Sequence, residues 1–374
     1  MLPTTNLSTD IGLTADGMNR LYHYIQTWID EGQAPGAAVG IARNGCLLSP
    51  RGFGRMGLAA DAAPLPPDAV FLTASITKPV SCAAVALLIE RGLFTLSTPV
   101  ASILPAFGQH GKDQVTVHHL MTHTSGLPDM IPENIAYRQR HAPLDEFIAR
   151  IYTLDLLFEP GTNISYQSTG IAILGEIVRQ ITDKPLPVFL DEEIFEPLGM
   201  NNSSLGNHCI DVDQVALIDV PDAQLGEAWN WNEAYWRGFG APWGGMFATV
   251  ADINSFTQMF LYNGLLGETR IFQPETITST ITDQTSSMGL IKAEVREKQS
   301  WGLGWRLNNP PTSFGVHTSP SLRTFGHHGA TGTMVWADLE TGLSCAVFTT
   351  KPSFCESDAL RQCSDMVMEA LICK

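Results

Sequence analysis

The chain has 374 residues, with 22 lysines and arginines and 38 aspartates and glutamates, which gives a formal net charge of −16 at pH 7. Hydrophobic residues make up 44% of the sequence and charged residues only 16%. This composition excludes a disordered chain, which combines low hydrophobicity with dense charge. The acidic balance also argues against nucleic-acid binding, which needs a basic face. At roughly 150 residues per domain, the length predicts about two domains in a globular protein.

The cysteines and the apolar stretches indicate the compartment. The seven cysteines are odd in number and form no Cys-x-x-Cys pair, so we expect reduced thiols and a cytoplasmic location. The sequence MLPTTNLSTDIGLTADG lacks a basic region followed by an apolar core, and so predicts no signal peptide. The longest strongly apolar stretch, 82–89, is shorter than the roughly 20 residues that a membrane-spanning helix needs. The sequence therefore predicts no membrane partner.

The chain opens with the signals of a helix and a hairpin. Over 14–31, apolar residues recur at helical spacing, namely Met18, Leu21, Ile25, Trp28 and Ile29. The apolar runs AAVGIAR and CLLSPRGFG then flank Asn44-Gly45, a pair that favours a tight hairpin turn because both residues accept positive φ. We therefore predict a helix followed by an antiparallel hairpin.

The end of the chain predicts more strands, and its middle predicts helices. The runs WGLGWRL, TFGHHG, GTMVWADL and LSCAVFTTK are typical of strands, and a last helix is expected over 360–371. The middle contains helical patterns such as ITKPVSCAAVALLIERG and GIAILGEIVRQITD, and a long loop is expected over 207–239.

These signals together predict an α/β (α+β) fold with an antiparallel sheet flanked by helices. Residues 1–74 and 245–374 are expected to form a sheet domain built from both ends of the chain. Residues 75–244 are expected to form an inserted, mainly helical domain. The active site is expected at the junction of the two.

Three patterns look like binding motifs but lack the context that those motifs need. The G-x-G-x-x-G match at 52–57 does not open a helix, as a dinucleotide site must. The aspartates of 211–222 lack the glycine and the terminal glutamate of a calcium loop. A histidine cluster has neither H-E-x-x-H nor a nearby cysteine, so a structural role is favoured over zinc: His118, His119 and His123. We therefore predict no metal site.

Ser75 and Lys78 form the first pattern that points to chemistry. Three residues of helix place both side chains on one face, with a rise of about 4.5 Å between them. A buried lysine with a depressed pKa can help to remove the proton of a serine hydroxyl. The pattern alone is common on exposed helices, but the apolar run 79–88 predicts a buried helix, where an ammonium is costly without a partner or a function.

Two further segments carry candidate residues. Tyr166, in the run YQS, could act as a base only beside cations that stabilise its phenolate, and the alternative is a tyrosine that anchors a loop. The run GHHGATG, 326–332, offers small residues at a strand edge where a substrate could approach the backbone, and the alternative is a glycine-rich turn. Taken singly, each structural alternative is favoured.

Together and in this order, the three segments resemble the serine β-lactamase-like family. This family includes class C β-lactamases, penicillin-binding DD-peptidases, family VIII carboxylesterases and D-amino-acid amidohydrolases. The likeness extends to the runs VTVHHLMTHTSGLPD, EPLGMNNSSLG and WGGMFATVADINSF, and it covers nearly the whole chain. It implies a β-lactamase/transpeptidase-like fold.

The resemblance implies a role for each matching position. Ser75 would be the acylated nucleophile, and Lys78 would share the work of the base with Tyr166, whose phenolate would later return the proton to the leaving group. The oxyanion hole would consist of the backbone N–H groups of Ser75 and Ala330. Water would then hydrolyse the acyl-enzyme, and neither a metal nor an organic cofactor is needed.

Two departures from the β-lactamase pattern bear on the substrate. His327-His328-Gly329 stands where penicillin-recognising members carry Lys-Thr-Gly, so an imidazole that is largely neutral at pH 7 replaces a fixed cation. We expect His327 to act in catalysis, and His328 and Gly329 to contact the substrate. Ser168, a further expected contact, replaces an asparagine whose amide could hold a substrate amide. Both departures favour an ester over a penicillin or a D-Ala-D-Ala peptide.

An aromatic segment precedes the return of the chain to the sheet, and its members are Trp229, Trp231, Tyr235, Trp236 and Trp243. It either forms a wall of an apolar cleft, with Trp243 in contact with the substrate, or packs as a loop over the core. The sequence supports the two interpretations equally.

The sequence therefore predicts a serine hydrolase that acts on a small-molecule ester or amide, with a carboxylesterase favoured. The enzymatic alternatives are a β-lactamase, a D-amino-acid or DD-peptidase, and an acyltransferase. A catalytically idle binding or scaffold protein is disfavoured, because it would not need to retain Ser75, Lys78 and Tyr166 together. The oligomeric state stays open.

Overall fold

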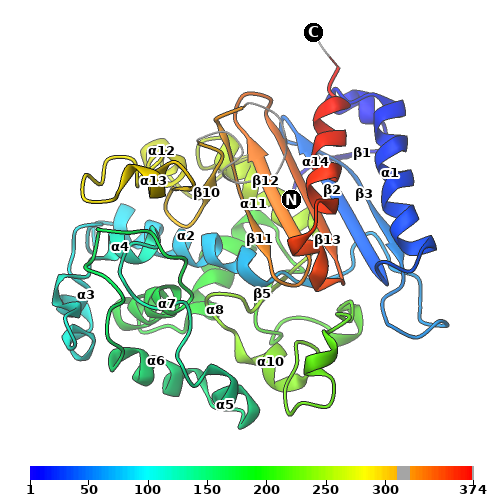
Figure 1. Cartoon of the computed structure of the whole chain (residues 1–374). Coiled ribbons are helices and arrows are strands. Elements are labelled where there is room, and N and C mark those ends of the chain that lie inside the picture. Colours follow the sequence, from blue (N-terminus) through cyan, green and yellow to red (C-terminus); the bar gives the residue numbers. More distant parts are fainter. Residues whose placement is uncertain (310–320, 373–374) are drawn as a thin grey trace.

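A computed structural model describes residues 1–309 and 321–372. Its centre is an eight-stranded sheet with the strand order β1-β3-β2-β13-β12-β11-β10-β9 (Figure 1). All neighbouring strands are antiparallel except β1 and β3, which are parallel. The strands are β1 (Thr4–Thr5), β2 (Gly36–Arg43), β3 (Cys46–Gly54), β9 (Ser300–Trp301), β10 (Arg306–Leu307), β11 (Thr324–Gly329), β12 (Thr333–Asp338) and β13 (Leu343–Thr349).

Helices cover both faces of this sheet. The first and last helices, α1 (Ala15–Asp30) and α14 (Ala359–Glu369), lie side by side on one face, and α11 (Val250–Leu261) packs on the other (Figure 1). Alternate residues of β13 point to opposite faces of the sheet. Cys345 and Val347 pack toward α1 and α14, whereas Ala346 and Phe348 join the core on the side of α11. Because both faces are covered, every residue of this strand is buried.

The remaining helices form a second region beside the sheet (Figure 1). At its centre α2 (Thr77–Glu90) packs against α7 (Thr169–Thr182), and α2 is buried on all sides over most of its length. Around them lie α3 (Val100–Ile103), α4 (Val117–Met121), α5 (Asn134–Gln139), α6 (Leu144–Tyr152), α8 (Leu186–Leu190), α9 (Glu196–Leu198), α10 (Ala234–Phe239), α12 (Pro274–Ile281) and α13 (Ala293–Arg296).

Two small sheets complete the structure. The strands β4 (Phe71–Leu72), β6 (Met246–Ala248) and β5 (Ser204–Leu205) pair in that order, next to the start of α2, while β7 (Leu265–Leu266) pairs with β8 (Thr269–Arg270). In the part of the chain that the structure describes, no helix combines the length and the apolar character that a membrane span requires.

The predicted fold class is confirmed, and so are its opening elements. Thr14 caps α1 by accepting the N–H of Gly17, and the hairpin turn has φ of 51° at Asn44 and 75° at Gly45. The predicted division into two domains stays a prediction. The sheet draws its strands from both ends of the chain, as expected.

Two local predictions were wrong. The run WGLGWRL does not form one strand but two short ones, β9 and β10, because Gly304 turns the chain with a φ of 85°. A side chain at Gly304 would also lie 2.7 Å from Cys82, so the turn packs directly on α2. The stretch 207–239 is not all loop, since it ends in helix α10.

Candidate active site

Ser75 lies in a single 3₁₀ turn, Ala74–Ile76, that leads directly into α2. Ala74 has a φ of 48°, in the left-handed region that a residue with a side chain occupies only at a cost of about 1–3 kcal/mol. The Thr77 hydroxyl holds this turn, since it donates to Ala74 O at 2.6 Å and accepts the Met246 N–H at 3.0 Å. The strained turn therefore presents Ser75, which is only partly buried, in a fixed orientation.

Lys78 supplies the nearest candidate base. Its side chain is only 1% exposed, and Nζ donates to Ser75 Oγ at 3.0 Å and to Trp243 O at 2.9 Å. Burial lowers the pKa of Lys78 to about 7, although Asp129 opposes the shift. A neutral amine is thus well populated at neutral pH, in position to accept the Ser75 proton.

Tyr166 lies on the loop before α7, with Lys78 Nζ 4.6 Å from the centre of its ring. Burial raises the pKa of the Tyr166 phenol well above its usual range, while a side-chain hydrogen bond with Ser75 acts in the opposite direction. The resemblance implies a phenolate here, but burial disfavours that species. Burial therefore favours a neutral Tyr166 phenol beside a neutral Lys78 amine over a phenolate beside an ammonium.

His327 and His328 add no cation to the site. His327 is 5% exposed, and its Nδ1 lies 2.6 Å from the carbonyl oxygen of His328. Because a carbonyl only accepts, Nδ1 carries the proton, and Nε2 is a buried acceptor with no donor among the described residues. Burial lowers the pKa of His327 well below its usual range, with Lys78 adding to the shift, and lowers that of His328 to about 4.

Most of these residues meet at one cavity of about 380 Å³, which is lined by Ser75, Tyr166, Gln299, Trp301, Arg306, His327, His328, Ala330 and Cys355. Two threonines fix the end of β11 against the Ser75 turn: Thr331 donates to Leu72 O at 2.7 Å, and Thr333 donates to Thr73 O at 2.9 Å. Ser75 and Ala330 therefore line the same cavity, and the oxyanion hole that the resemblance implies stays a prediction.

A family model described as Beta-lactamase matches residues 21–362 of the chain. The chain belongs to the beta-lactamase family. Its fold and family make the protein a hydrolase of the serine β-lactamase type.

Relatives of this beta-lactamase-family chain differ in the activities that their names give. Esterase EstB of Burkholderia gladioli is 35% identical over 182 residues, which cover 45% of this chain and 46% of the esterase, so the match spans about half of that relative. A penicillin-binding protein homologue from Caulobacter crescentus has a TM-score of 0.80 at 23% identity, over 96% of this chain and 99% of its own. A family VIII carboxylesterase has a TM-score of 0.74 at 23% identity, over 94% and 99%. These two structures show the fold.

Not every residue singled out in the sequence lines the cavity of this family member. Lys78 lies behind Ser75, while Ser168 and Trp243 border a separate small gap together with residues of α6. Gly329 packs against the Ser75 turn instead, since a side chain there would lie 2.1 Å from Thr73 O. Ser168 and Gly329 are buried, so their role toward a substrate stays a prediction.

The aromatic segment, part of which is helix α10, packs over the core rather than as a wall of the cavity. Trp229 and Trp236 are buried, and the Arg138 guanidinium lies 4.6 Å and 4.3 Å from their ring centres. Phe239 stacks on Trp236 with an interplanar angle of 11°. None of the described residues that line the cavity belongs to this segment.

The structure adds cavity residues that the sequence reasoning missed. Arg306 is the most consequential, because β10 pairs with β11 so that Arg306 lies opposite Gly326, next to His327. Burial lowers the pKa of Arg306, but a guanidinium stays charged at neutral pH. The cavity therefore contains a cation, the Arg306 guanidinium, which comes from β10 rather than from the His327 strand β11. Gln299, Trp301 and Cys355 complete the lining.

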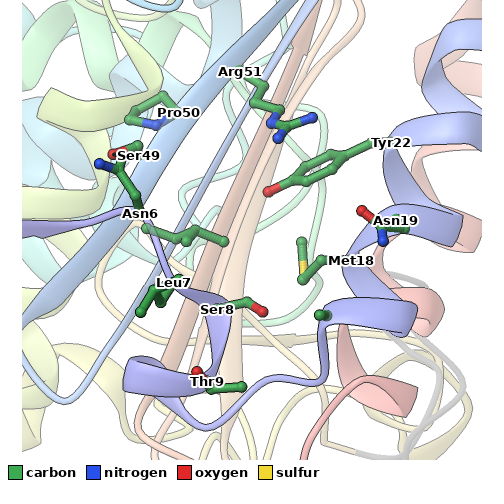
Figure 2. A pocket seen from close by; sticks show the side chains of 12 residues that line it. Asn6, Leu7, Ser8, Thr9, Met18, Asn19, Tyr22, Ser49, Pro50 and Arg51 are labelled. Atoms are coloured by element: carbon green, nitrogen blue, oxygen red, sulfur yellow. Dashed lines mark hydrogen bonds between the residues drawn. The ribbon is translucent and has the colours of Figure 1, made fainter.

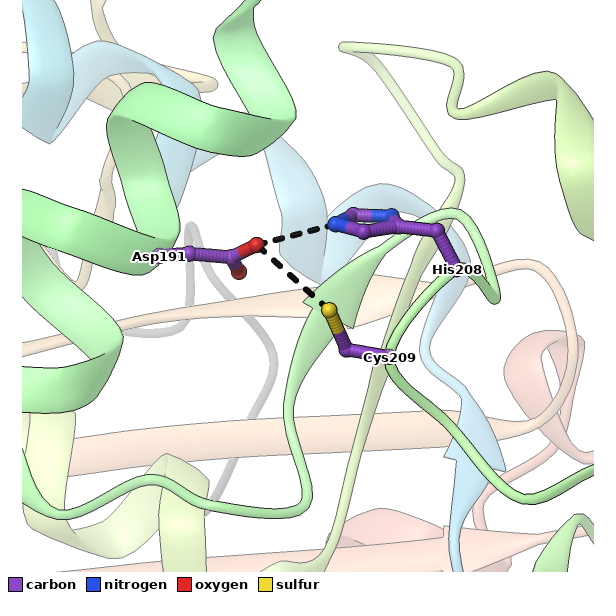
Figure 3. Close-up of side chains that lie close together, drawn as sticks. All are labelled: Asp191, His208 and Cys209. Atoms are coloured by element: carbon purple, nitrogen blue, oxygen red, sulfur yellow. Dashed lines mark hydrogen bonds and ion pairs between the residues drawn. The ribbon is translucent and has the colours of Figure 1, made fainter.

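Two other features of the molecule lie apart from this cavity. A pocket of about 380 Å³ between the N-terminal segment, α1 and β3 has Arg51 stacked 4.2 Å from the centre of the Tyr22 ring (Figure 2). None of the described residues that line this pocket is a lysine or a histidine. On another part of the surface Asp191 contacts His208 Nε2 at 2.9 Å and Cys209 Sγ at 3.9 Å (Figure 3). Hydrogen bonding accounts for that cluster, and neither feature supplies a serine activated by a base.

Proposed function

We propose that the protein is a carboxylesterase that hydrolyses small esters through an acyl-enzyme on Ser75. The observation that carries this proposal is the Ser75–Lys78 pair: the two polar atoms are 3.0 Å apart, and burial brings the pKa of the amine to about 7. A nucleophile beside a base of matched pKa, at the edge of a cavity of about 380 Å³, suits acyl transfer from a small substrate.

Acylation begins when the neutral Lys78 amine takes the proton of the Ser75 hydroxyl. Ser75 Oγ attacks the ester carbonyl carbon, and the N–H groups of Ser75 and Ala330 receive the oxyanion. When the bond to the alcohol breaks, the Tyr166 phenol gives its proton to the departing alkoxide and takes one from the Lys78 ammonium. The phenol is thus neutral before and after the step. Water then attacks the acyl-enzyme by the reverse sequence.

The preference for esters rests on the groups around this machinery. Ser168 offers no amide that could hold a substrate amide, and His327 is a neutral acceptor where a fixed cation would hold a substrate carboxylate. An ester needs a nucleophile and an oxyanion hole but neither of these contacts. The similarity to an esterase over 182 residues supports the same choice.

One observation favours a second candidate function. Arg306 places a guanidinium on the cavity wall beside His328, and a guanidinium binds carboxylates in a bidentate manner. An acyl donor with a free carboxylate, such as a D-amino-acid derivative or a peptide, could therefore be held without the missing lysine. This candidate differs from the esterase in needing Arg306 for recognition.

The Arg306→Gln variant separates the two candidates. With two p-nitrophenyl esters of equal acyl length, the neutral butyrate and the anionic hemisuccinate, we expect kcat/KM for the hemisuccinate to fall about 10–100-fold and that for the butyrate to change less than about threefold. The control is Arg51→Gln, which removes an arginine outside the cavity, one whose guanidinium lies over the Tyr22 ring. If Arg306→Gln affects neither ester, Arg306 takes no part in recognition.

The substrate class itself is tested by initial rates on a short-chain p-nitrophenyl ester, a chromogenic cephalosporin and a D-alanyl p-nitroanilide. We expect the ester to be cleaved fastest, and its cleavage to disappear in Ser75→Ala. Faster cleavage of the cephalosporin or of the anilide would overturn the esterase assignment.

We also propose a cytoplasmic, reducing setting, which suits the buried thiols of Cys82, Cys345 and Cys363.

A further inference from the structure

His123 holds the chain on both sides of Tyr166. Its carbonyl oxygen accepts the N–H of Ser165 at 2.9 Å, and its ring Nδ1 accepts the N–H of Gln167 at 3.2 Å. The side chain is fully buried, and the backbone has a φ of 61°, in the left-handed region. Residues in such strained conformations persist only where their surroundings hold them firmly, and they concentrate at functional sites.

The imidazole also packs directly on the phenol. Its ring centre lies 4.8 Å from that of Tyr166 and 4.3 Å from that of Trp301, which it meets edge to face at 75°. Because Nδ1 accepts a hydrogen bond, the proton is on Nε2, and the ring is neutral. The neutral state suits its position near two basic groups, Lys78 and Arg306.

Few side chains can make these contacts together. The side chain must place a hydrogen-bond acceptor where Nδ1 lies, so that it can bind the Gln167 N–H. It must also place an aromatic ring against Tyr166, and its backbone must accept positive φ. Asparagine provides the acceptor and tolerates this backbone, but has no ring. Phenylalanine provides the ring but no acceptor. Histidine combines the two functions.

We propose that His123 is a positioning residue for acylation. It holds the Tyr166 ring against Lys78 and Ser75, because it binds the residues before and after Tyr166 and packs on the Tyr166 ring. The inference rests on the proposed acyl-enzyme mechanism. If the ring is lost, Tyr166 can shift and water can reach Lys78. The base then loses both its alignment with Ser75 and the apolar surroundings that keep its amine neutral.

The test compares His123→Asn, which keeps the acceptor, with His123→Phe, which keeps the ring. The matched control is His141→Asn, because His141 also has a positive φ of 56° and stacks on a tyrosine, Tyr235, at 4.5 Å, but outside the cavity. The measurements are the rate of Ser75 labelling by a fluorophosphonate, kcat and KM for a p-nitrophenyl ester, and the pH midpoint of kcat/KM. Thermal unfolding of each variant shows that the folded protein is being compared.

We expect both His123 variants to label Ser75 about 10–100-fold more slowly than the wild type, with KM nearly unchanged, as a displacement of about 1 Å in a catalytic group produces. In His123→Asn the midpoint should also move to higher pH, because Lys78 gains water. The other titratable groups that face Lys78 are Asp129, Cys82, Tyr166 and His327. His141→Asn should match the wild type in every measurement.

Three other results overturn the inference. Wild-type labelling, kcat and midpoint in His123→Asn would show that the ring does not position Tyr166, while the esterase proposal would stand. A lower unfolding temperature with unchanged labelling would give His123 a structural role alone. If the wild type itself shows neither Ser75 labelling nor ester turnover, the proposed function fails and the inference fails with it.

Discussion

Ser75→Ala is expected to lower ester turnover at least about 10⁴-fold, because the variant has no group that can form the acyl-enzyme. The fold should be retained. The change removes one hydroxyl, which is only partly buried and whose partners are the Lys78 amine and the Tyr166 phenol. Initial rates on a p-nitrophenyl ester and the intact mass after fluorophosphonate treatment measure the effect. The wild type should gain one label and the variant none.

A second serine nearby, in helix α2, provides the control for this experiment. Ser81 is buried in α2 and donates to Pro242 O at 2.6 Å. Ser81→Ala should therefore cost about 1 kcal/mol of stability but leave turnover within a few-fold of the wild type. Turnover of more than about 1% of the wild-type rate in Ser75→Ala would place the nucleophile elsewhere.

The parts of this molecule that could be predicted from its sequence are those set by short-range signals. The hairpin follows from Asn44-Gly45, because both residues must accept positive φ, and they do so at 51° and 75°. The closeness of Ser75 and Lys78 follows from helical spacing, and the burial of Lys78 follows from the apolar residues after it. The fold class followed from the order of the predicted strands and helices, and the β-lactamase-like fold followed from the resemblance of several segments taken together.

The parts that could not be predicted depend on contacts between distant segments. Arg306 reaches the cavity only because β10 pairs with β11 in one register, and the sequence indicated a single strand where Gly304 makes a turn. The aromatic segment has enough aromatic residues to line a cleft, but Trp229 and Trp236 instead pack against Arg138, which comes from the distant helix α5. A structural role was predicted for His123 because its histidine cluster lacks both H-E-x-x-H and a nearby cysteine. Its contacts on either side of Tyr166 exist only in the folded chain.

Lys78→Met is expected to slow acylation about 10²–10⁴-fold, since the variant keeps the shape of the site but has no proton acceptor beside Ser75. In the wild type, kcat/KM for an ester should rise with pH through about 7 and then level off, because burial brings the pKa of Lys78 to about 7 and the neutral amine is the active form. His328, with a pKa of about 4, and Cys82, with a pKa of about 12, titrate outside this range. The variant should lose this rise with pH.

The same substitution should stabilise the fold in a pH-dependent way, which separates the role of Lys78 from simple damage. The lysine pKa is about 7 in the folded chain and 10.5 when unperturbed, so between these values the unfolded state binds more protons, and wild-type stability rises with pH. The methionine variant has no buried charge. Its gain in unfolding free energy, about 5 kcal/mol, should be full below pH 7 and disappear as the pH approaches 10.5.

Denaturant unfolding of both proteins at several pH values between 6 and about 10 measures this difference. The control is Lys112→Met, which removes another fully buried ammonium, one that donates to Leu154 O away from the cavity. That variant should keep the wild-type rate and its pH profile. Two results would show that Lys78 is not held in the apolar site as a neutral base. One is a Lys78→Met protein that is less stable than the wild type at pH 6. The other is a rate of ester hydrolysis by this variant that still rises through pH 7. A more stable but inactive variant would show that the cost of burying this amine is borne for catalysis rather than for folding.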